Sequence, residues 1–145
     1  MNFMNAIDIG ASGLSAQRTH LNVVSMNLAN ASTTRTVTGG PYHKKVVTMK
    51  AAPLTPFASV MGNQLERELR GVKVNAMVND PGPLRKVYDP THPDADKSGY
   101  VSYPNINAVQ EMANLMSVLR IYEANVNSIS TAKNMFNKAT EIGKG

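Results

Sequence analysis

The sequence contains no cysteine and no tryptophan, and aromatic residues make up only 6% of its 145 residues. The absence of cysteine excludes disulfide bonds, thiolate catalysis and cysteine-ligated zinc sites. No stretch approaches the roughly 18 consecutive apolar residues that a membrane-spanning helix needs. The first residues also lack a basic segment followed by an apolar core, so we expect no cleavable secretion signal. If the protein leaves the cytoplasm, it must use another route.

Proline is missing from both ends of the chain, since all eight prolines lie between residues 32 and 105. A proline-free segment can form a long helix, whereas proline and glycine break helices and mark turns. Short β-prone runs lie between these turns, at residues 45–49, 72–78 and 84–88. The sequence therefore predicts a mainly α protein with a small β insertion.

The predicted organisation has three parts. Residues 1–31 form an N-terminal assembly helix, residues 32–105 form a small, irregular β domain with loops, and residues 106–145 form a C-terminal assembly helix. Asn107 and Gln110 belong to a segment with the spacing of a capping box, which indicates where the second helix starts. We expect the two helices to combine into one terminal-helix domain.

Both predicted helices carry a regular apolar row. The N-terminal row repeats every seven residues, and the C-terminal row alternates spacings of three and four before a shift of phase. The rows consist of Ile7, Leu14, Leu21 and Leu28, and of Met112, Leu115, Leu119, Tyr122, Val126, Ile129 and Phe136. This coiled-coil-like pattern fits two arrangements: an antiparallel hairpin that buries its own seam, or helices that pack against copies and relatives of the chain.

The net charge is +5, and most of the excess lies between residues 35 and 86. These basic residues are scattered, and no aromatic platform or recognition helix accompanies them. A solvated or interface-facing basic surface explains them most simply. A nucleic-acid-binding module is the alternative from another class of function.

Few residues suggest catalysis or metal binding. Asp89 and His92 could exchange protons, but no nucleophile or second acid lies at a useful spacing. Asp94 and Asp96 match part of a calcium-binding loop, but its twelfth position is Asn105, which cannot supply the bidentate carboxylate. We therefore expect no enzyme activity, no cofactor, no metal site and no small-molecule substrate.

Two segments resemble a known family. Asn27, Leu28, Ala29 and Asn30 are similar to the Asn-Leu/Ile-Ala-Asn signature of flagellar rod, hook and hook-associated proteins. The more specific segment begins at Asp89 and ends at Tyr100; its matching residues are Asp89, Pro90, His92, Pro93, Asp94, Asp96, Gly99 and Tyr100. In order and spacing this segment resembles the FlgC family of proximal-rod proteins. The resemblance covers essentially the whole chain and is lowest over residues 58–71.

The resemblance implies a structural subunit of the proximal rod of the bacterial flagellar basal body, located in the periplasmic space. Its partners would be copies of itself, other rod proteins and the adaptor at the rod base next to the MS ring, with no nucleic acid. The resemblance also implies passage through the flagellar type III export gate without signal cleavage. Phe3 and Ile7 match the export signal of early rod and hook subunits, although both also fit the start of the apolar row.

Overall fold

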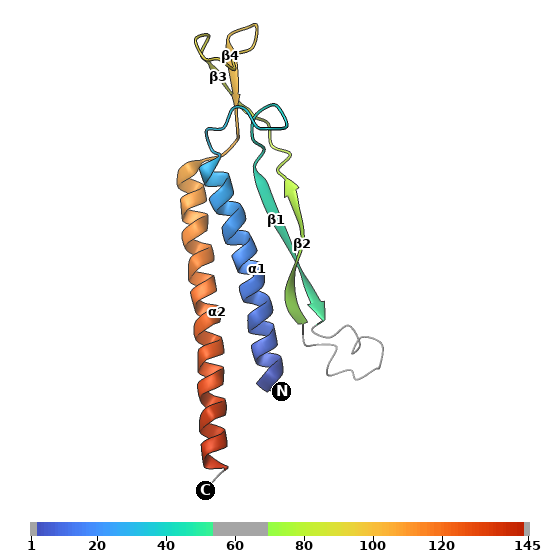
Figure 1. The fold of residues 1–145 in the computed structure, drawn as a ribbon, viewed down its shortest axis with the longest axis vertical. Coiled ribbons are helices and arrows are strands. Elements are labelled where there is room, and N and C mark those ends of the chain that lie inside the picture. The colour runs from blue at the N-terminus through green and yellow to red at the C-terminus, as the bar shows by residue number, and fades with distance from the viewer. Residues whose placement is uncertain (1–2, 54–69, 144–145) are drawn as a thin grey trace.

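The computed structural model describes residues 3–53 and 70–143. Its elements are α1 (Phe3–Ala29), β1 (Lys45–Pro53), β2 (Arg70–Asn79), β3 (Arg85–Tyr88), β4 (Tyr100–Tyr103) and α2 (Ala108–Ile142). The molecule is elongated: α1 lies between α2 and the β1–β2 hairpin, and β3–β4 extends beyond the helices (Figure 1). The expected fold class, mainly α with a small β insertion, is confirmed. Most of the segment of lowest family resemblance, residues 58–71, lies outside the described residues.

The two helices pack side by side in antiparallel directions (Figure 1). Two glycines of α1 allow a close approach, because a Cβ atom added at Gly10 would lie 2.6 Å from Cγ1 of Ile129. One turn further, a Cβ atom at Gly13 would lie 3.1 Å from the Asn125 amide. At its start, α2 is capped by Asn107, whose side chain accepts hydrogen bonds from two backbone N–H groups of the first turn. The predicted start of the second helix is thus confirmed.

The β1–β2 hairpin is antiparallel, and its register shifts between Thr48 and Met49, opposite which β2 contains the extra residue Asn75. Both strands are longer than the β-prone runs in the sequence, because cross-strand pairing continues through Pro53 and Arg70. The strands cross as they run along α1 (Figure 1). The start of β1 therefore lies against the C-terminal part of α1, while β2 contacts the helix nearer its N-terminus, where the Val72 N–H donates to the Ser12 hydroxyl at 3.1 Å.

The second sheet pairs β3 with β4, in register from Arg85 opposite Tyr103 to Tyr88 opposite Tyr100. The sequence predicts β3 but not β4, because a four-residue strand is too short to show a periodic pattern. Pairing with β3 and complete burial of Val101 stabilise β4 instead. Among the described residues, Pro104 just after β4 is also buried, and the buried apolar side chains of the helices are Ala16, Val23, Val24 and Val118. The core of the helix pair therefore lies between the second half of α1 and the first part of α2.

Candidate assembly site

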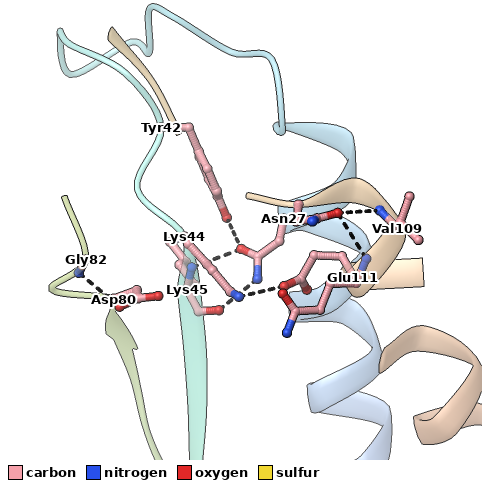
Figure 2. Close-up of polar contacts among 10 residues, drawn as sticks. Asn27, Tyr42, Lys44, Lys45, Asp80, Gly82, Val109 and Glu111 are labelled. Atoms are coloured by element: carbon pink, nitrogen blue, oxygen red, sulfur yellow. Dashed lines mark hydrogen bonds and ion pairs between the residues drawn. The ribbon is translucent and has the colours of Figure 1, made fainter. Parts of the chain in front are cut away.

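The first buried polar residue is Asn27, the first asparagine of the family signature, which is 1% exposed. Its side-chain amide donates to the backbone carbonyl of Lys45 at 2.8 Å, and its Oδ1 accepts from the Lys45 N–H at 2.9 Å. The Tyr42 hydroxyl donates to the same Oδ1 at 3.0 Å (Figure 2). One side chain of α1 thus holds both backbone groups of the residue with which β1 begins.

The second buried polar residue is Glu111 in the first turn of α2, which is 2% exposed. Its Oε1 lies 2.7 Å from Nζ of Lys44, a side chain that is 24% exposed (Figure 2). This Oε1 has no hydrogen bond of favourable angle to any described residue, so the contact is an ion pair without a well-aligned hydrogen bond. The buried carboxylate therefore depends on Lys44 for compensation of its charge.

We call this group of connected residues the joint; its members are Asn27, Tyr42, Lys44, Lys45 and Glu111. Burial raises the pKa of the Tyr42 phenol, and the nearby Glu111 carboxylate raises it further. The phenol therefore stays protonated at neutral pH and remains a hydrogen-bond donor to Asn27. Three segments distant in sequence, from α1, β1 and α2, are connected here through polar groups.

The sequence alone does not predict that Glu111, Lys44 and Tyr42 meet at one site. A signal was present for Glu111: with Leu115, Val118, Tyr122, Asn125 and Ile129 it forms a row of alternating spacings of four and three. A lone acid on the inward row of a helix indicates a buried ionic partner. No comparable pattern marks Lys44 or Tyr42, because both lie in an irregular segment before β1.

The remaining signature residues contact mainly their own helix end. The Asn30 amide donates to the Met26 carbonyl at 2.8 Å, and its Oδ1 accepts from the Thr33 hydroxyl at 3.2 Å. Between the two asparagines, Leu28 is half-buried and Ala29 is exposed. The two asparagines therefore differ: one connects elements, and the other caps the end of α1.

The predicted motif residues of the second segment form the loop between β3 and β4, except for Tyr100, which begins β4. Each of its carboxylates accepts hydrogen bonds: Asp89 from Thr91, Asp96 from the backbone of Ser98 and Tyr100, and Asp94 from the Thr34 hydroxyl at 2.8 Å. The pKa of Asp89 is lowered, chiefly by the Thr91 hydroxyl, and that of Asp96 chiefly by the Tyr100 N–H. These bonds give the carboxylates a structural role in shaping the loop.

The other motif residues fix the same loop. The ring Nδ1 of His92 accepts from the Asp94 N–H, while Pro90 and Pro93 are exposed. Gly99 has a φ of 80°, and a Cβ atom there would lie 2.8 Å from the Tyr88 ring, which packs edge-on against Tyr100. Glycine is thus required at this turn by both backbone conformation and space.

The predicted apolar rows divide between the inside and the outside of the helix pair. The four residues of the N-terminal row, Ile7, Leu14, Leu21 and Leu28, are half-buried. In α2, the half-buried members are Leu115, Tyr122 and Ile129, and the exposed members are Met112, Leu119, Val126 and Phe136. Phe3 begins α1, but its side chain lies outside what the structure describes.

A second apolar row on α2 lies beside the inward row and is exposed in the single subunit. It combines three exposed members of the predicted seam with two residues that the sequence analysis did not select, Val109 and Met116. We call this row the outward stripe; its residues are Val109, Met112, Met116, Leu119 and Val126. Their exposed fractions run from 39% for Leu119 to 78% for Val109. Large apolar side chains at helical spacing and this exposure are typical of a protein interaction surface.

Within the described ranges, no group of three or more histidines and carboxylates is placed to hold a metal ion. Neither α1 nor α2 is apolar enough over a sufficient length to cross a membrane.

Comparisons with known proteins agree with these features. Residues 7–35 match the model of the family "Flagella basal body rod protein", and residues 97–142 match "Flagellar basal body rod FlgEFG protein C-terminal". The chain is 41% identical to the flagellar basal-body rod protein FlgC of Bacillus subtilis, with 99% of this chain and all of the relative covered. It is 38% identical to FlgC of Borreliella burgdorferi, with both chains covered completely, and 38% identical to that of Salmonella typhimurium, over 99% of this chain and all of the relative. The chain therefore belongs to the FlgC family, whose members are structural, non-enzymatic subunits of the flagellar basal-body rod.

Proposed function

We propose that this subunit polymerises, with copies of itself and with other rod proteins, into the proximal rod, the shaft that transmits torque through the periplasmic space. The observation that carries the proposal is the outward stripe of α2. Its five large apolar side chains are at least 39% exposed on a helix whose inward row already packs against α1. Burying such a row against a neighbour removes apolar surface from water and so favours association.

The shape of the molecule favours head-to-tail contacts. The subunit is long and thin (Figure 1), and the exposed residues of the outward stripe follow one another along α2. A surface that contacts a different surface of the next subunit produces an open filament instead of a closed ring, provided that the rotation does not close. A rod needs this kind of contact, and the adaptor at the rod base would provide the first such surface.

The proposal includes export through the flagellar type III gate, with Phe3 and Ile7 as the contact residues. Ile7 is half-buried in the folded subunit, so it would contact the gate before α1 packs against α2. Replacing Phe3 with Ala should reduce secretion while the cytoplasmic level of the subunit persists. Normal secretion with defective rods would leave Phe3 with a packing role only.

The assembly surface is tested by Leu119→Asp. Leu119 is already 39% exposed in the subunit, so the variant should fold, whereas an unpaired carboxylate buried between subunits is unfavourable. We expect the variant to be exported but not to complete rods, and the cells to be non-motile. Lys138→Ala is the matched control, because Lys138 is exposed, lies away from the stripe and pairs with the exposed Glu141 of its own helix. Normal swimming of Leu119→Asp cells would show that the stripe is not an assembly surface.

A further inference from the structure

The contacts at the start of β1 resemble the pairing of two strands. In an antiparallel pair, a residue exchanges both an N–H and a C=O bond with the residue opposite it. Here the side chain of Asn27 makes both bonds to Lys45, at 2.9 Å and 2.8 Å. The first residue of β1 is therefore hydrogen-bonded to a single side chain of α1. These two directional bonds fix the position of the strand along the helix.

The orientation of the Asn27 amide is also determined. Its Oδ1 accepts from two donors, the Lys45 N–H and the Tyr42 hydroxyl, which uses both lone pairs of the oxygen. The Nδ2 group must then face the Lys45 carbonyl. An apolar residue of similar size could fill the space but could not replace any of the three bonds.

The neighbouring residue, Lys44, connects the same point to two other elements. Its ammonium group lies 2.7 Å from Glu111 of α2, and its carbonyl oxygen accepts from the Asp80 N–H, next to the end of β2, at 2.7 Å. Two consecutive residues thus attach the hairpin to α1, to α2 and to the end of its own second strand. Burial of Ala16, Val23 and Val24 also holds the region together, but apolar burial is non-directional and does not select one register.

We infer that Asn27 and Glu111 are positioning residues, which fix the angle and register of the β1–β2 hairpin relative to the helix pair. Far from the joint, the described hairpin has one side-chain hydrogen bond to α1, the exposed bond between Val72 and Ser12. Loss of the joint would therefore let the hairpin swing or slide along α1 while both helices remain formed. The inference rests on the proposed function in one respect: the hairpin position matters for assembly because it is set relative to the outward stripe.

Because the chain has no native cysteine, two introduced cysteines can carry spin labels without side reactions. We choose Lys50→Cys in β1 and Ser117→Cys in α2, since both positions are exposed. Pulsed electron–electron double resonance on the isolated full chain should give a narrow distribution of distances between the two labels. Adding Asn27→Ala should widen or shift that distribution, while circular dichroism shows unchanged helix content. The matched control is Asn30→Ala, which removes an amide whose described bonds stay at the end of α1.

Equal distributions in Asn27→Ala and Asn30→Ala would overturn the inference. If Asn27→Ala does not fold, Tyr42→Phe and Glu111→Gln decide, because each removes one interaction of the joint while keeping the side-chain volume. A widened distribution in either variant supports the inference, and unchanged distributions in both refute it. The measurement uses the unassembled chain, so its failure differs from failure of the proposed function, which is tested by rod completion in Leu119→Asp cells.

Discussion

The two ends of the helix pair differ in how they are packed. At the end next to the joint, Asn27, Glu111 and Val118 are almost completely buried. At the opposite end, where both termini lie (Figure 1), no described residue before Ala16 in α1 or after Val118 in α2 is buried to that degree. We call residues 3–15 and 119–142 the open end. The single chain thus completes its packing around the joint and leaves the open end without fully buried side chains among those described, while the outward stripe runs from Val109 near the joint to Val126 in the open end.

This difference in packing suggests that the two ends have different roles. The joint uses directional hydrogen bonds and a buried ion pair, which favour one arrangement of the hairpin and the helices. The open end uses exposed apolar side chains such as Met135, which is 68% exposed, and these adapt to a partner more readily. Substitutions at the joint should therefore affect the free subunit, whereas substitutions at the open end should affect the polymer.

The largest effect on the free subunit is expected from Lys44→Ala. This change leaves the Glu111 carboxylate buried without its cation, and removing one member of a buried ion pair typically costs about 3–5 kcal/mol. Equilibrium denaturation of the purified subunit measures the loss. The control is Lys133→Ala, an exposed lysine at the open end, which should change stability by less than about 0.5 kcal/mol. Similar stabilities for the two variants would show that the joint does not dominate the stability of the subunit.

A matched pair of valines in α2 compares the two ends directly. Val118 is 3% exposed and Val126 is 41% exposed, so truncation to Ala removes the same atoms from different surroundings. We expect Val118→Ala to lower the free energy of unfolding by about 1.5–3 kcal/mol and Val126→Ala by less than about 0.5 kcal/mol. In the rod, Val126→Ala should instead have the larger effect of the two, because Val126 becomes buried against a neighbour. An equal loss in the free subunit would contradict the difference between the ends.

A smaller effect is expected from Gly10→Ala at the open end. The new Cβ atom would lie 2.6 Å from the side chain of Ile129, which favours a rotamer change of that residue. A rotamer change costs on the order of 1 kcal/mol, and replacing glycine by alanine within a helix gains about as much. Thermal unfolding should therefore change little. A loss above about 2 kcal/mol would instead indicate that this end is packed as tightly as a protein core.

The smallest effect concerns the acidic loop between β3 and β4. The pKa values of Asp89 and Asp96 are lowered by hydrogen bonds made only in the folded state. A lowered pKa contributes stability that is present above the unfolded value and is lost as pH falls through the folded value. Stability should therefore decrease slightly below about pH 4. The double variant Asp89→Asn, Asp96→Asn should reduce this part of the decrease, as pH-dependent denaturation can measure; an unchanged slope would assign the acid sensitivity to other carboxylates.

Much of the fold could be predicted from the sequence because it depends on long-range regularity. Proline-free ends with apolar rows predict helices, and the capping pattern at Asn107 locates the start of α2. The short strand β4 could not be predicted, since its four residues acquire their conformation from β3. The sequence also could not predict which residues of the α2 row face inward. Leu115 and Leu119 look equivalent in a three-four pattern, and only the position of α1 decides which of them faces inward.

The joint illustrates the same limit at the level of single residues. Asn27 belongs to the family signature, yet the sequence does not show that its amide binds Lys45, 18 residues away. The ion pair between Lys44 and Glu111 connects residues still further apart, across the whole β region. Such contacts result from tertiary structure, so neither periodicity nor local propensity contains them.

The antiparallel helix pair has a consequence for the order of folding events. Contacts at the joint such as Asn27 with Lys45 close short loops, whereas Gly10 meets Ile129 only after almost the entire chain has been looped back. Closing the longer loop costs roughly 1.5–2 kcal/mol more in chain entropy. We therefore expect the signature asparagine and the hairpin to associate early and the chain termini to meet last. A chain that emerges unfolded from a secretion channel would then hold its termini apart for the longest time, when neighbouring subunits can still reach them.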